Sequence, residues 1–420
     1  MSDHPTTQSR LHIVIVGGGL AGLAAASYLR ENHDVTILER YSLDFAKNDY
    51  AMSIAPNTHR LLLEQGIEDK HLQATTLTYV WGCDASGKVN RETLAESLAR
   101  FGTTTIFTRR SRLHAELHTL ATAPKRAGKP ARIIENVKIA SVDVNKGIIT
   151  TDTGEVYTGD LIIGADGINS VVRSAILSGP NASPKPSGLA AYLCTVPRSI
   201  LASSPLLSFQ TNPTRGLGMA AFVGAHPRKR VLVFPADEQD YQIVAYHPED
   251  AWVERFLSSG SSIIRSADVP AGRVEEDFAD FPEDVRMMLR EATPPDVWRI
   301  RDIERLGTWT RGRAVIIGDA AHAVTPHFGQ GCNIAIEDGE ALGYFLSSVS
   351  SPEEIATALE SFEKIRIPRA HMVQFASRQV ANTLPEEEKR DAPPFDSAAF
   401  MTKVYGYKSA KVEVEASIEA

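Results

Sequence analysis

Cysteine is scarce in this sequence, and its spacing excludes two kinds of site. The 420 residues include three cysteines, an odd number, at Cys83, Cys194 and Cys332. Cysteines so far apart form neither a disulfide framework nor a CxxC metal site, so we expect no bound metal. Unpaired thiols are typical of a reducing compartment, which predicts a cytoplasmic location.

A surplus of basic residues is also missing. Lys and Arg number 44 and Asp and Glu number 52, which gives a formal net charge of −8. Proteins that bind the phosphate backbone of nucleic acids normally carry a basic surplus. We therefore expect no nucleic-acid partner.

The sequence contains no long, unbroken apolar run. The best candidate, residues 13–29, is free of charge but is interrupted by four glycines, Gly17, Gly18, Gly19 and Gly22. A signal peptide or a membrane span would be near-continuous in Leu and Ala. We therefore expect no membrane span.

The overall amino-acid composition is that of an ordinary globular protein. Hydrophobic residues make up 43% of the chain and charged residues 23%, which excludes wholesale disorder and a fibrous repeat. The length predicts two or three domains. Oligomeric state leaves no trace in the sequence, and we expect a monomer or a homodimer.

Short β-branched runs that end in glycine organise the chain. Residues 11–16 predict a buried strand, a glycine turn and a helix follow, and residues 35–40 predict a second strand, as in a βαβ unit. Residues 160–167 and 314–322 repeat the pattern of a strand running into a glycine. These junctions predict one nucleotide-binding domain built from discontinuous segments, whereas the strand-rich stretch from about 189 to 300 predicts a separate sheet.

The first junction carries the pattern Gly17-x-Gly19-x-x-Gly22. The first glycine permits a tight turn, the second lets the backbone approach a pyrophosphate, and the third lets the helix pack closely on the strand. Glu39 follows at the end of the next strand, at the spacing expected of an acid that binds a ribose. The context favours a dinucleotide site over a purely structural turn.

Two further motifs follow in the chain. Asp166-Gly167 ends the strand at 160–167, with Arg173 soon after, and Gly318-Asp319 opens a long run that extends to Asp338. An isolated Asp-Gly pair usually marks only a turn. All three motifs in this order are far more specific.

Together the three motifs resemble those of the group A FAD-dependent aromatic hydroxylases, the single-component flavoprotein monooxygenases, in particular the salicylate-hydroxylase-like branch. The resemblance covers most of residues 10–380. It implies an α/β fold with a Rossmann-like FAD-binding domain, a substrate domain on a mostly antiparallel sheet, and a C-terminal helical segment. We place the FAD-binding domain at 10–75, 105–185 and 300–345, the substrate domain at 76–104 and 186–299, and the C-terminal helices and tail at 346–420.

The resemblance also implies roles for single residues around FAD. Glu39 would bind the adenosine ribose, and Asp319 the ribityl or pyrophosphate region. Gly331, Cys332 and Asn333 would present their backbone to the isoalloxazine ring, and Pro326 would lie beside the reactive edge of the flavin.

Two more motifs have implied partners. The stretch 108–114 resembles the helix start at which the family places its FAD-contacting arginine, which would be Arg110, or Arg109 if the register slips by one residue. Asp166 and Gly167 would serve both FAD and the pyridine nucleotide. A second Rossmann unit for NAD(P)H is missing from the sequence, which fits a co-substrate that docks transiently.

The implied activity is hydroxylation of an aromatic small molecule, which we expect to be a phenol. NADH or NADPH would reduce FAD, and O₂ would then give a flavin C4a-hydroperoxide that transfers oxygen to the ring. Two alternatives stay open: a related flavoenzyme that epoxidises or dehydrogenates a non-aromatic substrate, and an FAD-binding module without oxygenation.

The sequence departs from the family where the substrate would be held. Leu193 replaces a common arginine that would bind an anionic ring substituent, and Phe234 replaces a common tyrosine. Both changes favour a substrate that is less acidic or more hydrophobic than salicylate, although unchanged specificity stays open. Histidine suits proton transfer near neutral pH, and the catalytic candidates are His226, Tyr192 and Pro326. Three further residues are possible replacements: Tyr246, His247 and His327.

Overall fold

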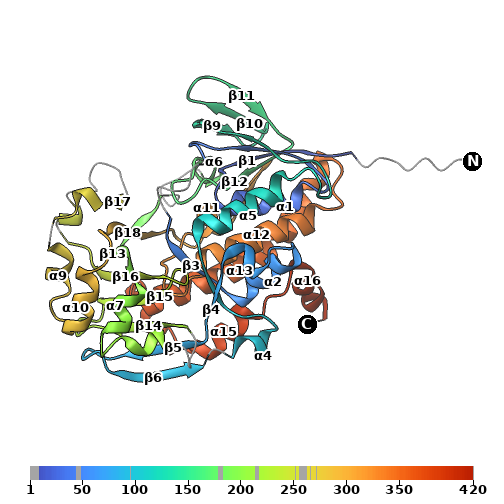
Figure 1. Ribbon diagram of the computed structural model, residues 1–420. Helices are drawn as coiled ribbons and strands as arrows, with labels where there is room; N and C mark the ends of the chain where they lie inside the picture. Colours follow the sequence, from blue (N-terminus) through green and yellow to red (C-terminus); the bar gives the residue numbers. More distant parts are fainter. Residues whose placement is uncertain are drawn as a thin grey trace, which may run out of the picture.

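The computed structural model describes most of the chain. The described residues are 9–43, 49–94, 96–177, 183–212, 217–250, 252–254, 263–264, 266–270 and 272–419. Four sheets and the helices that pack on them make up this part of the protein (Figure 1).

A six-stranded sheet contains the first glycine turn. Its order is β19-β20-β12-β1-β2-β8, with parallel pairing except between β19 and β20. Ile13 of β1 lies opposite Leu161 of β12 and Val35 of β2. Parallel strands covered on both faces need near-continuous apolar runs, which explains the β-branched sequence of β1. The strands are β1 (His12–Val16), β2 (Asp34–Leu38), β8 (Arg132–Ile134), β12 (Leu161–Gly164), β19 (Thr310–Arg311) and β20 (Ala314–Ile316).

Helices cover one face of this sheet, and a small antiparallel sheet lies over the other. Figure 1 shows α1, α5, α12 and α13 on one side of β1 and β12, and β9, β10 and β11 on the opposite side. The covering elements are α1 (Leu20–Leu29), α5 (Arg110–Thr122), α12 (Gly331–Leu346), α13 (Ile355–Ala381), β9 (Ile139–Asp143), β10 (Ile148–Thr151) and β11 (Val156–Thr158).

An eight-stranded sheet forms the second half of the molecule. Its order is β17-β18-β13-β16-β15-β14-β5-β6, and its pairs are antiparallel except β14 with β5. The strands are β5 (Tyr79–Cys83), β6 (Val89–Leu94), β13 (Lys185–Pro197), β14 (Gly218–Val223), β15 (Arg230–Pro235), β16 (Asp240–Pro248), β17 (Ile263–Ile264) and β18 (Asp296–Asp302). The α/β architecture with a mostly antiparallel second sheet, predicted from the sequence, is confirmed.

Both faces of the eight-stranded sheet are covered. One face builds a core with α9 (Arg273–Asp277) and α10 (Glu283–Arg290), and includes Tyr192, Ile243 and Phe278. The other face, which includes Ala191 and Tyr246, packs against Ala381 at the end of α13. This second face is therefore turned toward the half of the molecule that contains the glycine turns.

Shorter elements connect the two halves. A three-stranded sheet of order β3-β7-β4 leads from the glycine-turn half toward the eight-stranded sheet. The remaining short elements of the two halves are β3 (Ala51–Ile54), β4 (Thr75–Thr76), β7 (Ile106–Arg109), α2 (Pro56–Glu64), α3 (Asp69–Leu72), α4 (Ser97–Phe101), α6 (Val171–Leu177), α7 (Arg198–Ser203) and α11 (Asp319–His322), with the 3-10 turns η3 (Ser208–Thr211), η4 (Ser266–Asp268) and η5 (Pro352–Glu354).

The C-terminal segment is helical almost to its end. After α13 come α14 (Glu386–Asp391), α15 (Ser397–Tyr405) and α16 (Ala410–Glu419). Tyr407 is buried and donates a hydrogen bond from its hydroxyl to Glu340 of α12 at 2.6 Å. A buried phenol with a hydrogen-bond partner anchors the segment to α12.

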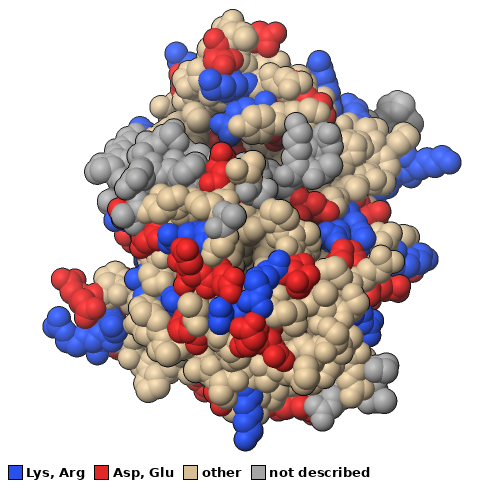
Figure 2. Space-filling model, turned by 60° about the vertical axis from the view of Figure 1, so that its left-hand side comes forward, with Lys and Arg blue, Asp and Glu red and all other residues tan. Residues whose placement is uncertain are grey.

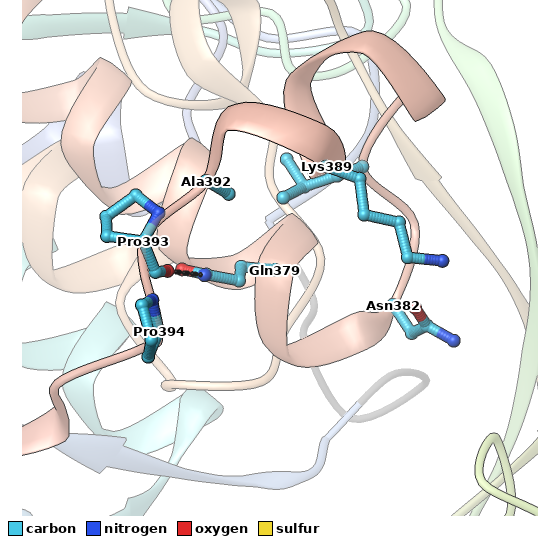
Figure 3. Close-up of a pocket in the computed structure, with 7 residues that line it drawn as sticks. Gln379, Asn382, Lys389, Ala392, Pro393 and Pro394 are labelled. Atoms are coloured by element: carbon cyan, nitrogen blue, oxygen red, sulfur yellow. Dashed lines mark hydrogen bonds between the residues drawn. The ribbon is translucent and has the colours of Figure 1, made fainter.

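A small hollow lies between α13 and this segment. It has a volume of about 290 Å³. The amide of Gln379 donates a hydrogen bond to the Pro393 carbonyl at 2.6 Å across it (Figure 3). Its lining consists of Gln379, Asn382, Leu384, Lys389, Ala392, Pro393 and Pro394. None of the predicted site residues is among them.

We expect Gly339→Ala to destabilise the protein. A Cβ at Gly339 of α12 would lie 2.7 Å from the backbone nitrogen of Ala25 in α1, and overpacking of this kind costs about 1–3 kcal/mol. Urea unfolding measures the change. Gly307→Ala is the matched control, because a Cβ there meets nothing within 4 Å. Equal midpoints for the two variants would contradict close packing of α1 on α12.

Candidate functional site

Two glycines of the first motif are required by close backbone packing. Gly17 has a φ of +109°, and a Cβ there would lie 2.3 Å from the Ala165 carbonyl oxygen. A Cβ at Gly22 would lie 2.0 Å from the carbonyl oxygen of Gly17. Any side chain at either position would therefore push β1, α1 and the end of β12 apart.

Gly19 differs from both, because a Cβ there would meet nothing within 4 Å. Gly19 is the N-cap residue of α1, and no side chain caps the helix. The first backbone N–H groups of α1 therefore have no capping side chain, and the space beside Gly19 is open. Uncapped N–H groups at a helix start carry partial positive charge and suit a phosphate.

Glu39 lies beside this turn at the end of β2. Its carboxylate accepts hydrogen bonds from the backbone nitrogens of Gly18 at 2.6 Å and Tyr41 at 2.9 Å. The side chain is half-buried. The two contacts hold the carboxylate against the glycine turn, where the sequence placed it.

His114 of α5 holds the same glycine turn through a hydrogen bond. Its Nε2 lies 2.8 Å from the Gly18 carbonyl oxygen. Burial lowers the pKa of His114 from 6.5 to about 4, because a buried imidazole loses the hydration of its charged form. A neutral imidazole can thus donate to Gly18 across the physiological range.

The carboxylate of Asp166 is occupied by its own helix. It accepts hydrogen bonds from the Ser170 hydroxyl and from the backbone nitrogens of Val171 at 2.7 Å and Val172 at 3.2 Å. Asp166 therefore caps α6. The buried Arg173 in α6 donates to the Ala320 carbonyl at 3.0 Å, which ties the second motif to the third.

The third motif lies against the first. A Cβ at Gly318 would be 2.8 Å from Cβ of Ala21 and 3.3 Å from Cβ of Ala335. Ala21 belongs to the first turn of α1 and Ala335 to the second turn of α12. The starts of the two helices thus meet at Gly318, and Asp319, the next residue, has an exposed side chain there.

The start of α12 is the second uncapped helix terminus. Gln330 is its N-cap residue, and its side chain forms no capping hydrogen bond. A Cβ at Gly331 would lie 4.0 Å from Asp319 Oδ1. Cys332 is half-buried, and burial raises the pKa of its thiol to about 12, so it remains protonated.

Asn333 holds this terminus in place with its side chain. Its Nδ2 donates to the carbonyls of Ser53 at 3.1 Å and Gly329 at 2.6 Å, and its Oδ1 accepts from the Ala55 nitrogen at 2.9 Å. The side chain thus joins β3, the loop before α12 and the start of α2.

A buried network of charged side chains holds the turn at Gly318. Asp338 accepts hydrogen bonds from the Gly318 nitrogen at 2.9 Å, from His322 Nε2 at 2.6 Å and from Arg366 Nε at 2.9 Å. Arg366 also lies 2.8 Å from Glu337. These four side chains are fully buried, and the charged partners lower the pKa of Asp338 and of Glu337 although burial opposes this.

The two neighbouring arginines face different partners. Arg109 Nε donates to Asp237 at 2.9 Å, in the turn between β15 and β16. Arg110 lies close enough to Asp319 and Cys332 to influence the titration of both. The structure thus brings Arg110, and not Arg109, to the meeting point of the two helix starts.

Two of the catalytic candidates, Tyr192 and His226, lie away from this region. Tyr192 is fully buried on the face that packs against α9, where its hydroxyl donates to Asp277 at 2.5 Å. His247 stacks on Tyr192, with ring centroids 4.8 Å apart. His226 is exposed in the turn between β14 and β15, and its Nδ1 accepts from the Arg228 nitrogen at 3.2 Å.

The remaining candidates come together on the opposite face of the sheet. The Tyr246 hydroxyl lies 3.5 Å from the Pro326 carbonyl oxygen, and its ring centroid is 5.2 Å from that of His327. Pro326 is exposed. The loop before α12 and the eight-stranded sheet therefore approach each other at these three residues.

Sequence reasoning missed three residues of this region. The Tyr50 ring lies edge-on to Trp298 at 5.7 Å between centroids, and Arg230 lies opposite Tyr246 in the register of β15 and β16. Strand alternation at 230, 232 and 234 was the available signal for Arg230. Tyr50 has no local sequence pattern that predicts its position.

Comparison with known proteins identifies the family. Residues 10–258 and 286–376 match the family model described as FAD binding domain. The chain belongs to this family. It is an FAD-dependent monooxygenase of the group A type, as the three motifs predict.

Curated relatives match over nearly the whole chain. Hispidin-3-hydroxylase of Neonothopanus nambi is 30% identical over 385 residues, with 87% of each chain covered. The 3-amino-4-hydroxybenzoate 2-monooxygenase PtmB3 of Streptomyces platensis is 26% identical, with 97% of this chain and 98% of the relative covered.

Solved structures share the fold. CtdE, in complex with FAD and a substrate, has a TM-score of 0.77 at 21% identity, with 98% of both chains covered. A salicylate hydroxylase in complex with its substrate has a TM-score of 0.74 at 22% identity, with 97% of this chain and 98% of the other covered.

The described surface carries charged side chains of both signs. Acidic and basic side chains alternate on the face shown in Figure 2, without a broad basic area among its coloured residues. Within the described ranges, no three His, Cys, Asp or Glu side chains are grouped to hold a metal ion. Likewise, none of the described helices has the length and apolarity of a membrane span.

We expect the free energy of unfolding to fall as the pH is lowered from about 6.5 to about 4, because unfolded histidine binds a proton in this window and folded His114 does not. His114→Gln keeps a neutral donor for Gly18 and should make the fall shallower. Urea unfolding at several pH values measures the slope, with His12→Gln, which removes an exposed histidine, as the control. An unchanged slope in His114→Gln would contradict the buried neutral state.

Proposed function

We propose that the protein binds FAD where α1 and α12 begin, and that it uses NADH or NADPH and O₂ to hydroxylate an aromatic small molecule. The observation that carries the proposal is the meeting of two uncapped helix starts at Gly318, with Gly19 open above one and Asp319 exposed beside the other. Such termini suit the anionic and electron-rich parts of a dinucleotide.

The residues present fit FAD along its length. The N–H groups of α1 and the open position at Gly19 would hold the pyrophosphate, while Gly17 and Gly22 keep the turn tight. Glu39 would accept hydrogen bonds from the adenosine ribose. Asp319 would face the ribityl chain, and the backbone of Gly331, Cys332 and Asn333 would meet the isoalloxazine ring, with Arg110 beside it.

Asp166 contributes differently from the other acids. Because its carboxylate caps α6, we assign the contact with FAD or the pyridine nucleotide to the backbone of Asp166 and Gly167. A Cβ at Gly167 would meet nothing within 4 Å, which leaves room for such an approach.

When bound, FAD supplies the reduction of O₂ and the transfer of oxygen, and the protein supplies position and shielding. Pro326, Tyr246 and His327 form the approach between the flavin-side loop and the eight-stranded sheet, so we place the aromatic ring there. The apolar residues of this sheet face, such as Leu232 and Val244, would exclude water from it. The names of the relatives, several of them hydroxylases or monooxygenases, support this substrate class.

The state of the cysteines bears on the cellular location. The three cysteines are free, which fits a reducing compartment such as the cytoplasm. We propose a monomer or a homodimer that acts without nucleic acid.

Oxidation of NADH and NADPH by the FAD-loaded protein tests the proposed activity. A panel of phenols and aromatic acids should stimulate oxidation, and mass spectrometry should show a product that has gained one oxygen. Stimulated oxidation with a product that lost hydrogen, or with an epoxide from a non-aromatic compound, would favour the related flavoenzyme. Bound FAD that is never reduced by either nicotinamide would indicate a binding module.

We expect Gly19→Val to abolish tight FAD binding without unfolding the protein. Its Cβ enters open space, so the flavin-free fold tolerates it, but the side chain would occupy the position proposed for the pyrophosphate. Flavin fluorescence titration should show affinity weakened at least about tenfold, with an unchanged thermal midpoint for the flavin-free protein.

Gly22→Ala is the matched comparison, because its Cβ would lie 2.0 Å from the Gly17 carbonyl oxygen. This variant should lower the thermal midpoint even without flavin. Full FAD affinity in Gly19→Val would refute the proposed placement.

A further inference from the structure

The C-terminal segment is attached to the core of the molecule at Tyr407, whose side chain is buried. Its ring lies over two guanidinium groups of α13, with the ring centroid 4.6 Å from Cζ of Arg369 and 5.3 Å from Cζ of Arg366. Its hydroxyl donates to Glu340 of α12, and the same carboxylate accepts from the Ala410 nitrogen at 3.0 Å. One aromatic side chain therefore joins this segment to both helices.

The two arginines under the Tyr407 ring bind acids of α12. Arg366 donates to Glu337 at 2.8 Å and to Asp338 at 2.9 Å. Arg369 donates to Glu337 at 2.6 Å, and its side chain is only 9% exposed. Ion pairs in the interior depend on good geometry and on the exclusion of water, and a cation over an aromatic face is further stabilised. The Tyr407 ring therefore both orients and shields these ion pairs.

Both acids are connected to the proposed flavin site. Asp338 accepts a hydrogen bond from the Gly318 nitrogen, where the starts of α1 and α12 meet. Glu337 accepts from Nδ2 of Asn57 at 2.6 Å, and the same nitrogen lies 3.2 Å from Oε1 of Gln330, the N-cap residue of α12. A displacement of the two arginines would therefore reach the turn at Gly318 and the first turn of α12.

The carboxyl of Glu340 makes this attachment dependent on pH. Burial raises the pKa of Glu340 to about 7, against the hydrogen bonds from Tyr407 and Ala410. The titratable or charged groups that face it from the surrounding elements are Tyr28 of α1, Glu337 of α12, Arg366 of α13 and Tyr407. Release of the segment would expose the carboxyl and return its pKa toward the ordinary 4.5. The attached state is therefore favoured most below about pH 4.5, and this advantage is lost as the pH rises through about 7.

We propose that Tyr407 is a positioning residue of the flavin site, through which the C-terminal segment fixes Arg366 and Arg369 and thereby the start of α12. The inference rests on the proposed function, since it concerns the binding of FAD at that helix start. It assigns a role in the site to a residue far beyond the last flavin motif, which ends at Asp338.

Titration of the flavin-free, full-length variants with FAD at about pH 6, followed by flavin fluorescence, tests the proposal. Tyr407→Leu removes the ring and the hydroxyl and should weaken FAD binding about tenfold or more. Tyr407→Phe keeps the ring over both arginines and should recover much of that affinity.

Tyr405→Leu is the matched control. Tyr405 belongs to the same segment but packs edge-on against Phe101, with ring centroids 5.6 Å apart, so its loss loosens the segment without uncovering the arginines. Its FAD affinity should stay within about twofold of that of the wild type. Wild-type affinity in Tyr407→Leu, or equal weakening in both leucine variants, would overturn the proposal.

The pH dependence of FAD binding gives a second readout, which decides the question even if Tyr407→Leu fails to fold. The wild type should lose affinity at least about threefold between about pH 6 and pH 8, as Glu340 loses its proton. Glu340→Gln keeps an acceptor for Tyr407 and Ala410 but does not titrate, so its affinity should stay constant. A wild-type affinity that does not change, or an equal loss in Glu340→Gln, would contradict the inference alone. A wild-type protein that binds no FAD at either pH would contradict the proposed function, and this inference with it.

Discussion

The buried carboxylate of Asp338 is the interaction on which the arrangement of the site depends. It accepts hydrogen bonds from the Gly318 nitrogen, His322 and Arg366. It therefore joins the third glycine turn, α11, α12 and α13. Removing one member of a buried charge network leaves the others uncompensated, which typically costs about 3–5 kcal/mol. The network is therefore a positional constraint: while Gly318 is held at Asp338, the starts of α1 and α12 must remain adjacent.

This constraint explains how a site for a large cofactor is preorganised. Each helix start presents free N–H groups, and each is held by side chains that do not themselves face the proposed cofactor. His114 supports the turn before α1 through Gly18, and Asn333 supports the loop before α12 through Gly329. The eight-stranded sheet then brings its partly polar face, with Tyr246 and Arg230, against the loop at Pro326. Cofactor binding is thus assigned to the starts of α1 and α12, and substrate selection to the face of the eight-stranded sheet that lies against them.

Steric requirements made part of this arrangement predictable. Glycines at 17 and 22 are needed because backbone atoms approach within 2.3 Å of any added Cβ, and such needs leave a spacing in the sequence. The fold class followed from the same motifs. The face occupied by Tyr192 did not, because both faces of β13 are buried and its apolar sequence gives no alternation of polarity. His226 lies in a stretch with Gly224 and Pro227 that indicates a turn. The partnership of Asp338 with Arg366 joins separate helices, and neither residue differs in sequence from an ordinary surface charge.

A crystal structure of the FAD-bound protein tests the central claim most directly. The account predicts the pyrophosphate within hydrogen-bond distance of the first N–H groups of α1, and the isoalloxazine ring at Gly331–Asn333 with one edge toward Pro326 and Tyr246. Flavin density elsewhere, or a ring separated from the start of α12, would contradict the account. So would a flavin-bound structure in which Gly318 had left Asp338, because the two helix starts would then be held by something else.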